Sequence, residues 1–202
     1  MATVVVPFRG SDPKRRLDPI SEPGRALLAE AMLADVLDAA LAVGRVLVVA
    51  AGAPALPEGV ELVPDPLHGQ GAAVLAALEV AAAGPTAAYL VVNADLPCAT
   101  PRDLLALAGA IPEGGLALAV AADGTTNALA FSNASLFEPL YGPGSAERFA
   151  ALAPSRFVDA PNLIDDVDTL ADLLRLAPRV GQHTARVLLE LPPLFIPRGA
   201  AA

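Results

Sequence analysis

The stretch YLVVNADLPCATPRDLLALAGA, residues 89–110, decides the fold of this chain. It starts with a continuous apolar run, which is typical of a strand buried on both faces of a sheet and predicts a strand over 89–93. Asp95 follows directly, and Thr100 then starts a helix, because threonine is a good N-cap and the proline after it suits the first helical position. The stretch therefore predicts a strand, a turn that carries a carboxylate, and a helix that ends near residue 110.

The same alternation of strand and helix extends over most of the chain. Apolar runs predict further strands, and apolar residues at helical spacing predict helices between them, with Gly44 as the stop of the first helix. Such alternation specifies an α/β fold in three layers, αβα, with a mainly parallel central sheet and right-handed crossovers. We expect strands at residues 4–6, 46–50, 60–63, 89–93, 116–121, 128–131 and 156–158, and helices at 25–43, 72–83, 101–110, 145–152, 169–177 and 182–190.

The composition describes one globular domain. The chain has 202 residues, of which 54% are hydrophobic and 17% charged, so it can bury its own core and is not a disordered chain. A single cysteine excludes a disulfide scaffold and a cysteine-rich zinc site, and two histidines argue against a histidine-built metal site. We expect a single domain over residues 1–202, with a loose tail over 192–202.

The charge limits the kinds of partner. A formal net charge of −9 argues against nucleic acid or an anionic membrane, because both bind a basic face. A small anionic ligand needs only a local cluster of cations. No apolar run reaches the roughly 18 residues of a membrane helix, and residues 1–8 carry no basic leader, so we expect a cytoplasmic protein. The oligomeric state leaves no signal in the sequence.

Cations gather in the loop after the first strand. Arg9, Lys14, Arg15 and Arg16 all fall there, and Lys14 is the only lysine of the chain. Backbone N–H groups and cations after a first strand suit a phosphate chain. The loop is neither a Walker A sequence nor a G-x-G-x-x-G fingerprint. A solvated basic loop explains these residues equally well, so phosphate binding is one of two interpretations.

Acidic residues mark two further places. Asp95 lies at the carboxyl end of a strand, where it could hold Mg²⁺ together with phosphate oxygens or serve only as a turn residue or cap. Asp165, Asp166 and Asp168 would repel one another unless a cation neutralises them. An extended backbone would point Asp166 and Asp168 the same way, which suits a shared ion. The alternative is an acidic helix N-terminus, capped by Asp168 or Thr169.

Two polar turns and two isolated residues give weaker signals. The segments 125–127 (Thr-Thr-Asn) and 142–145 (Gly-Pro-Gly-Ser) offer hydroxyl and N–H groups that could bind a carboxylate or phosphate, or they are an ordinary turn and an N-cap. His68 suits a surface position and Cys98 a structural one. No arrangement typical of a cysteine or serine nucleophile accompanies them.

Taken in chain order, these motifs resemble the 2-phospho-L-lactate guanylyltransferase family, which acts in the biosynthesis of the deazaflavin coenzyme F-420. The matching segments span nearly the whole chain, and Thr-Asn-Ala-Leu, Gly-Pro-Gly-Ser and Asp-Val-Asp-Thr are specific in combination. The segments are Val6-Pro7 with Lys14-Arg15-Arg16-Leu17, Asp65 with Gly69-Gln70-Gly71, Ala94-Asp95-Leu96-Pro97, Asp123-Gly124 with Thr126-Asn127-Ala128-Leu129, Tyr141-Gly142-Pro143-Gly144-Ser145, and Asp166-Val167-Asp168-Thr169.

The resemblance implies a fold and a reaction. The fold would be that of the nucleotide-diphospho-sugar transferases, the glycosyltransferase-A type, with a nucleotide-binding half at about 1–95 and an acceptor-binding half at about 96–191. The reaction would join GMP from GTP to a small phosphorylated acid and release pyrophosphate. The acid would be 2-phospholactate, phosphoenolpyruvate or 3-phosphoglycerate.

The resemblance also implies a role for particular residues. It assigns the ligands of Mg²⁺, the residues that contact the nucleotide, the residues that hold the acceptor and the residues that act in catalysis. By match these are Asp95, Asp166 and Asp168 for Mg²⁺; Pro7, Lys14, Arg16, Gly69 and Gly71 for the nucleotide; Thr126, Asn127, Gly142, Gly144 and Ser145 for the acceptor; and Lys14, Arg16 and Asp95 for catalysis.

The chain departs from the family pattern at two places. The family usually carries an asparagine after its second glycine, in a glycine-leucine-asparagine run, whereas the equivalent stretch here, Gly69-Gln70-Gly71-Ala72-Ala73, has none, and the family often has a lysine in the loop that reads Phe8-Arg9-Gly10 here. Two alternatives therefore stay open: a related nucleotidyltransferase with a molybdenum-cofactor or sugar-phosphate acceptor, or a non-catalytic nucleotide-binding homologue. The three carboxylates argue against the second, because a homologue without activity has no reason to keep them.

Overall fold

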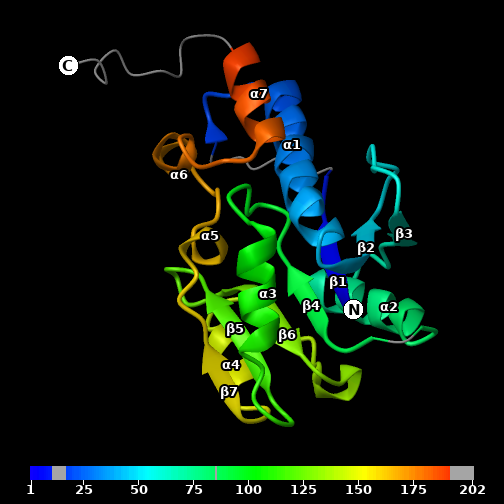
Figure 1. Cartoon of the computed structure of the whole chain (residues 1–202). Coiled ribbons are helices and arrows are strands. Elements are labelled where there is room, and N and C mark those ends of the chain that lie inside the picture. The colour runs from blue at the N-terminus through cyan, green and yellow to red at the C-terminus, as the bar shows by residue number, and fades with distance from the viewer. Residues whose placement is uncertain (11–16, 85, 192–202) are drawn as a thin grey trace.

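The computed structural model describes residues 1–10, 17–84 and 86–191, and within them strands and helices alternate along the chain (Figure 1). Lys14, Arg16 and the tail over 192–202 lie outside these ranges. The strands are β1 (Ala2–Phe8), β2 (Gly44–Ala50), β3 (Val60–Pro64), β4 (Tyr89–Val92), β5 (Leu116–Val120), β6 (Thr126–Phe131) and β7 (Ser155–Phe157). The helices are α1 (Glu22–Leu41), α2 (Gln70–Ala81), α3 (Pro101–Gly109), α4 (Ser145–Ala150), α5 (Pro161–Ile164), α6 (Leu170–Leu176) and α7 (Gln182–Glu190).

The described strands form one seven-stranded sheet in the order β3-β2-β1-β4-β6-β5-β7. Pairing is parallel from β3 through β4 and again between β5 and β7, whereas β6 runs antiparallel to β4 and β5. The sheet is therefore mostly parallel, and the predicted α/β class is confirmed. Because β2, β1 and β4 are parallel neighbours, their carboxyl ends meet at one edge, where open sheets of this kind bind ligands.

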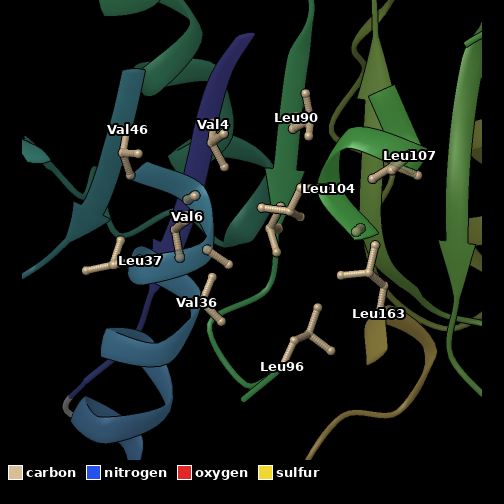
Figure 2. Packing of buried hydrophobic residues seen from close by; sticks show 14 of the residues in the cluster. Val4, Val6, Val36, Leu37, Val46, Leu90, Leu96, Leu104, Leu107 and Leu163 are labelled. Atoms are coloured by element: carbon tan, nitrogen blue, oxygen red, sulfur yellow. The ribbon is translucent and has the colours of Figure 1, made fainter. Parts of the chain in front are cut away.

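Helices cover both faces of this sheet. On one face Val4 of β1 shares a buried cluster with Val36 of α1 and Leu104 of α3, as Figure 2 shows. On the other face the next residue, Val5, belongs to a second cluster that contains Val74 of α2. Successive residues of β1 thus serve opposite faces, which is why its valines form an unbroken run rather than alternating with polar residues.

A third buried cluster lies between α1, α6 and α7 and reaches the turn after β4. It joins Leu28 and Met32 of α1 to Leu173 of α6, and it includes Cys98 and Val167. Burial raises the pKa of the Cys98 thiol, which keeps it neutral. The cluster anchors the turn after β4 and the acidic segment to α1 through apolar contacts.

Helix α7 lies along α1 (Figure 1) and is held there by a buried carboxylate. The two carboxylate oxygens of Asp35, in the middle of α1, accept hydrogen bonds from the N–H groups of His183 (2.9 Å) and Thr184 (3.0 Å). The N–H of Gly181 donates to the carbonyl of Pro97 at 2.8 Å. The start of α7 is therefore fixed both to α1 and to the turn that follows β4.

The boundaries of the first helix differ from the prediction. Helix α1 begins earlier because the hydroxyl of Ser21 accepts a hydrogen bond from the N–H of Gly24 at 3.3 Å and caps the helix. The helix ends at Leu41, and Gly44 is the first residue of β2 rather than the helix stop. A Cβ at Gly44 would collide with the carbonyl of Ala2 in β1, so close strand pairing is what requires glycine there.

Two other details differ as well. Thr126 and Asn127 begin β6, whereas the sequence analysis placed them in a turn, and the short helix α5 was not predicted. The helices α3 and α7 match their predicted ranges within a residue. In the described ranges, no helix is both long and apolar enough to cross a bilayer.

Candidate functional site

A cavity of about 440 Å³ opens at the carboxyl ends of β1 and β4. Its walls come from the end of β1, from α1, from the loop and helix after β3, from the turn after β4 and from the loop before α4. This is the edge of the sheet where the fold predicts a ligand. The lining residues are Pro7, Phe8, Arg9, Ala29, Met32, Asp65, Gln70, Ala73, Asn93, Ala94, Asp95, Tyr141 and Gly142.

Asp95, which lines this cavity, lies close to two other carboxylates. Asp95, Asp166 and Asp168 each present an oxygen, and these oxygens lie within 4.8 Å of one another. Asp95 follows β4, while Asp166 and Asp168 flank Val167, whose side chain is fully buried and whose N–H donates to the carbonyl of Asp95 at 3.1 Å. Anchoring Val167 in this way turns its two acidic neighbours to the other side of the extended segment. Three oxygen donors at this spacing fit Mg²⁺, which takes a few carboxylates and completes its shell with phosphate and water.

Asp165 belongs to a different interaction. Its two carboxylate oxygens accept hydrogen bonds from Arg175 (2.8 Å) and Arg179 (2.7 Å). Burial raises the pKa of Asp165, but the hydrogen bonds and charges of the two arginines outweigh burial and lower it. The acidic run therefore splits: Asp165 is neutralised by arginines, and its neighbours Asp166 and Asp168 turn toward Asp95.

The nucleotide-binding residues predicted from the resemblance occupy three different situations. Pro7 lines the cavity, and Arg9 lies exposed on its rim. Gly69 precedes α2 with a φ of 94°, which glycine adopts without strain. Gly71 is buried, and a Cβ there would come within 2.8 Å of the Cα of Pro139, so its lack of a side chain serves packing. Lys14 and Arg16 lie outside the described residues.

A glycine loop forms the opposite wall of the cavity. Gly142 and Gly144 have φ values of 114° and 69°, conformations that favour glycine. The guanidinium of Arg148 donates hydrogen bonds to the carbonyls of Leu140 (2.8 Å) and Pro143 (2.6 Å), which holds the loop from behind. Gly142 lines the cavity and is half-buried, whereas Gly144 lines a second cavity of about 660 Å³.

The other residues predicted to hold the acceptor are buried behind this loop. The hydroxyl of Ser145 accepts a hydrogen bond from the N–H of Thr126 at 3.0 Å. It donates a hydrogen bond to the hydroxyl of Thr126 at 3.1 Å. The side-chain amide of Asn127 donates to the carbonyl of Ile164 at 2.9 Å. The structure thus brings Thr126, Asn127 and Ser145 next to the cavity wall, and a direct contact with an acceptor stays a prediction.

Residues that the sequence analysis did not select also line the cavity. Gln70 starts α2 and Asn93 follows β4, and their side chains are joined by a hydrogen bond of 2.7 Å. Tyr141 packs edge-on against Phe149 at 5.2 Å between ring centroids, and burial raises the pKa of its hydroxyl. Position relative to strand ends is the signal that could have found Asn93, which stands two residues before Asp95.

The arrangement as a whole suits phosphate chemistry. A cation held by the three carboxylates would face phosphate oxygens, and the backbone of the glycine loop offers a polar wall to a second anion. No histidine or cysteine is among the described residues that line the cavity at the ends of β1 and β4. The site therefore favours transfer between two phosphorylated ligands that are positioned and neutralised, rather than attack by a protein nucleophile.

Known proteins resemble the chain in sequence and in fold. Residues 24–154 match the MobA-like NTP transferase domain. The chain is 37% identical to the 2-phospho-L-lactate guanylyltransferase of Natrialba magadii, over 90% of this chain and 85% of that protein. It is 34% identical to the phosphoenolpyruvate guanylyltransferase of Nocardia farcinica, over 87% and 84%. Its fold is similar to that of a Desulfovibrio desulfuricans G20 protein described as a nucleotide-diphospho-sugar transferase, with a TM-score of 0.74, 17% identity and 94% of each chain covered.

Proposed function

Because the chain belongs to the MobA-like NTP transferase family and to its guanylyltransferases, we propose that it transfers GMP from GTP to a phosphorylated three-carbon acid and releases pyrophosphate. The acid is 2-phospholactate, phosphoenolpyruvate or 3-phosphoglycerate, the acceptors that the sequence resemblance implies. The product is a guanosine-diphosphate-linked acid, and we place the reaction in the biosynthesis of coenzyme F-420.

One observation carries the proposal: Asp166 and Asp168 meet Asp95 at the cavity that Asp95 and Gly142 of the glycine loop both line. These three residues would hold Mg²⁺, which supplies charge neutralisation on the phosphate oxygens when bound. Without a cation, three carboxylates would repel the triphosphate of GTP. A cation shared by the carboxylates and the phosphate oxygens would bring the two into one site.

The reaction that this site supports is an in-line displacement. An oxygen of the acceptor phosphate attacks the α-phosphorus of GTP, the bond from that phosphorus to the bridging oxygen breaks, and pyrophosphate leaves with the electron pair. The attacking phosphate is already ionised at pH 7, since its second pKa is about 6, so no residue has to remove a proton. The protein contributes position and charge.

The two ligands take opposite ends of the cavity. The end of β1 and the start of α2, with Pro7, Arg9 and Gly69, form the nucleotide end. Lys14 and Arg16 contact the triphosphate in this proposal, as the resemblance implies. The loop at Gly142 and the residues behind it form the acceptor end.

Pyrophosphate release tests the proposal directly. Purified protein is incubated with Mg²⁺ and GTP together with each of the three acids in turn, and ATP replaces GTP in a parallel series. Mass spectrometry identifies the product. We expect turnover with GTP and one acid, and a product that carries GMP on that acid. Binding of GTP without turnover on any of the three acids would overturn the proposed acceptor class.

A further inference from the structure

Three side-chain amides run in a row from the cavity to the acidic segment. Nε2 of Gln70 donates to Oδ1 of Asn93 at 2.7 Å. Nδ2 of Asn93 is shared between the carbonyl of Thr126 and Oδ1 of Asn127, at 3.4 Å each, and the backbone N–H of Asn93 donates to the carbonyl of Asn127 at 3.0 Å. Nδ2 of Asn127 donates to the carbonyl of Ile164 at 2.9 Å. We call Gln70, Asn93 and Asn127 the amide chain.

One backbone carbonyl sets the direction of the whole amide chain. The carbonyl of Ile164 can only accept, so Asn127 must turn its NH₂ group toward it and its oxygen toward Asn93. Asn93 then meets two acceptors, the oxygen of Asn127 and the carbonyl of Thr126, and must present its own NH₂ group to them. Its oxygen is left for Gln70. No amide in the chain can turn over without placing two acceptors or two donors face to face.

The amide chain connects the nucleotide end of the cavity to the metal-binding segment. Gln70 and Asn93 line the cavity, whereas Asn127 is buried, with 2% of its surface exposed. Ile164, the last residue of α5, lies two residues before Asp166 along the chain. At the other side Asn93 lies two residues before Asp95. The chain therefore links the backbone on which Asp95 stands to the backbone on which Asp166 and Asp168 stand.

We propose that the amide chain of Gln70, Asn93 and Asn127 is a positioning device that sets the spacing between Asp95 and the pair Asp166 and Asp168. This proposal rests on the proposed function for the identity of the ion. It adds to that function the residues that position the ligands of the ion. Buried hydrogen bonds in series polarise one another, so a break at Gln70 weakens the link at Ile164 as well. A misplaced carboxylate pair binds its cation less tightly, because metal affinity depends on ligand geometry and on the groups that orient the ligands.

Mn²⁺ binding to the nucleotide-free protein tests the device without turnover. Mn²⁺ stands in for Mg²⁺ because both take octahedral oxygen ligands, and electron paramagnetic resonance follows the loss of the free-ion signal. We compare Asn127→Ala, which removes the link to Ile164, with Gln70→Leu, which removes only the first donor. The matched control is Gln182→Leu, at the other glutamine of the chain, whose amide donates to Asp38 on the exposed side of α1.

We expect Asn127→Ala to weaken Mn²⁺ binding by roughly 10-fold and Gln70→Leu to weaken it by about 3-fold or more, with no change in Gln182→Leu. In turnover assays the Mg²⁺ concentration for half-maximal rate should rise in the same order, while in Gln70→Leu the KM for the acid at saturating Mg²⁺ stays unchanged. A purely structural role would lower the amount of folded protein. It would not raise the Mg²⁺ requirement while leaving the KM for the acid unchanged.

The outcomes separate the two proposals. Equal Mn²⁺ affinity in the wild type and in Gln70→Leu overturns the positioning role, even if Asn127→Ala fails to fold. A wild type that binds no Mn²⁺ overturns it too, since there is then no ion site to position. Graded Mn²⁺ affinities in a protein that transfers no GMP to any of the three acids would support the device and overturn only the proposed reaction.

Discussion

Ser145 and Thr126 are joined by two hydrogen bonds. The hydroxyl of Ser145 accepts a hydrogen bond from the backbone N–H of Thr126 at 3.0 Å and donates one to the hydroxyl of Thr126 at 3.1 Å. Both residues are buried, with at most 2% of their surface exposed. The pair fastens the glycine loop before α4 to the first residue of β6. The loop that forms the acceptor end of the cavity is thus attached to the central sheet at a single buried hydroxyl.

Ser145→Ala should therefore destabilise the protein and weaken acceptor binding. The change leaves the buried N–H and hydroxyl of Thr126 without this partner, which costs about 1–3 kcal/mol in the free energy of unfolding. Urea denaturation measures the loss, and the KM for the acid should rise with little change in the KM for GTP. Ser155→Ala, at an exposed position in β7, is the matched control and should behave as the wild type. If the KM for the acid is unaltered in Ser145→Ala, the glycine loop does not contribute to acceptor binding.

Loss of the cation or of one of its ligands should abolish turnover. Chelation by EDTA should stop GMP transfer, and added Mg²⁺ should restore it, because in the proposed reaction the ion held by the three carboxylates neutralises the charge on the phosphate oxygens. Asp95→Ala should lower kcat by roughly 100-fold or more while circular dichroism stays that of the wild type. Asp38→Asn, a surface change on α1, is the control. Full activity of Asp95→Ala would show that Asp95 is not a ligand of the ion.

Stability should depend on pH through Asp172, which caps α6 together with Thr169. Burial raises the pKa of Asp172, but hydrogen bonds from Thr169 and the charge of Arg175 outweigh burial and lower it. A folded pKa below the unfolded value of about 3.9 stabilises the fold above that pH, and this contribution disappears as the pH falls through the folded pKa. The stability difference between the wild type and Asp172→Asn should therefore be larger at pH 7 than near pH 2.

Urea denaturation at both pH values checks this prediction. In a Thr169→Ala background the difference caused by Asp172→Asn should shrink, since the hydrogen bond from the Thr169 hydroxyl that lowers the pKa is gone, while the bond from the backbone N–H of residue 169 stays. Thr169→Ala alone should cost about 1 kcal/mol at pH 7 through loss of the N-cap. A pH-independent effect of Asp172→Asn would show that the carboxylate contributes as a hydrogen-bond acceptor and not through its charge.

Local patterns predicted much of the fold and part of the candidate site. The sequence around Thr100 predicts the N-cap of α3. Because side chains alternate in direction along an extended backbone, the sequence also predicts that Asp166 and Asp168 lie on the same side, opposite Val167. Asp95 was found because it follows a strand end. Signals of this kind depend on neighbours in sequence, and they were sufficient wherever backbone geometry alone places a side chain.

Other features depend on partners far apart in the chain. Gln70 meets Asn93 across 23 residues, and Asn93 meets Asn127 across 34, so no local pattern marks the amide chain. Asp165 resembles its acidic neighbours in sequence, and only the arrival of Arg175 and Arg179 from α6 and the loop after it sets it apart.

Gly71 gives the last prediction, because the start of α2 packs directly against Pro139 at this position. Gly71 is the second residue of α2, and a Cβ on it would lie 2.8 Å from the Cα of Pro139. Pro139 belongs to the chain segment just before the glycine loop and would have to move. Gly71→Ala should therefore lower the free energy of unfolding by about 1–3 kcal/mol through overpacking, and the larger Gly71→Asn should lower it further.

A side chain at residue 71 should thus destabilise this protein, and the loss of stability should grow with the size of the side chain. Gly109→Ala in α3 is the matched control: a Cβ there meets nothing within 4 Å, and alanine favours a helix over glycine by up to about 1 kcal/mol. Urea denaturation ranks the three variants, and titration with GTP shows whether displacement of Pro139 reaches the cavity through Tyr141. A Gly71→Asn protein as stable as the wild type would mean that Pro139 moves at little cost and that space does not restrict position 71.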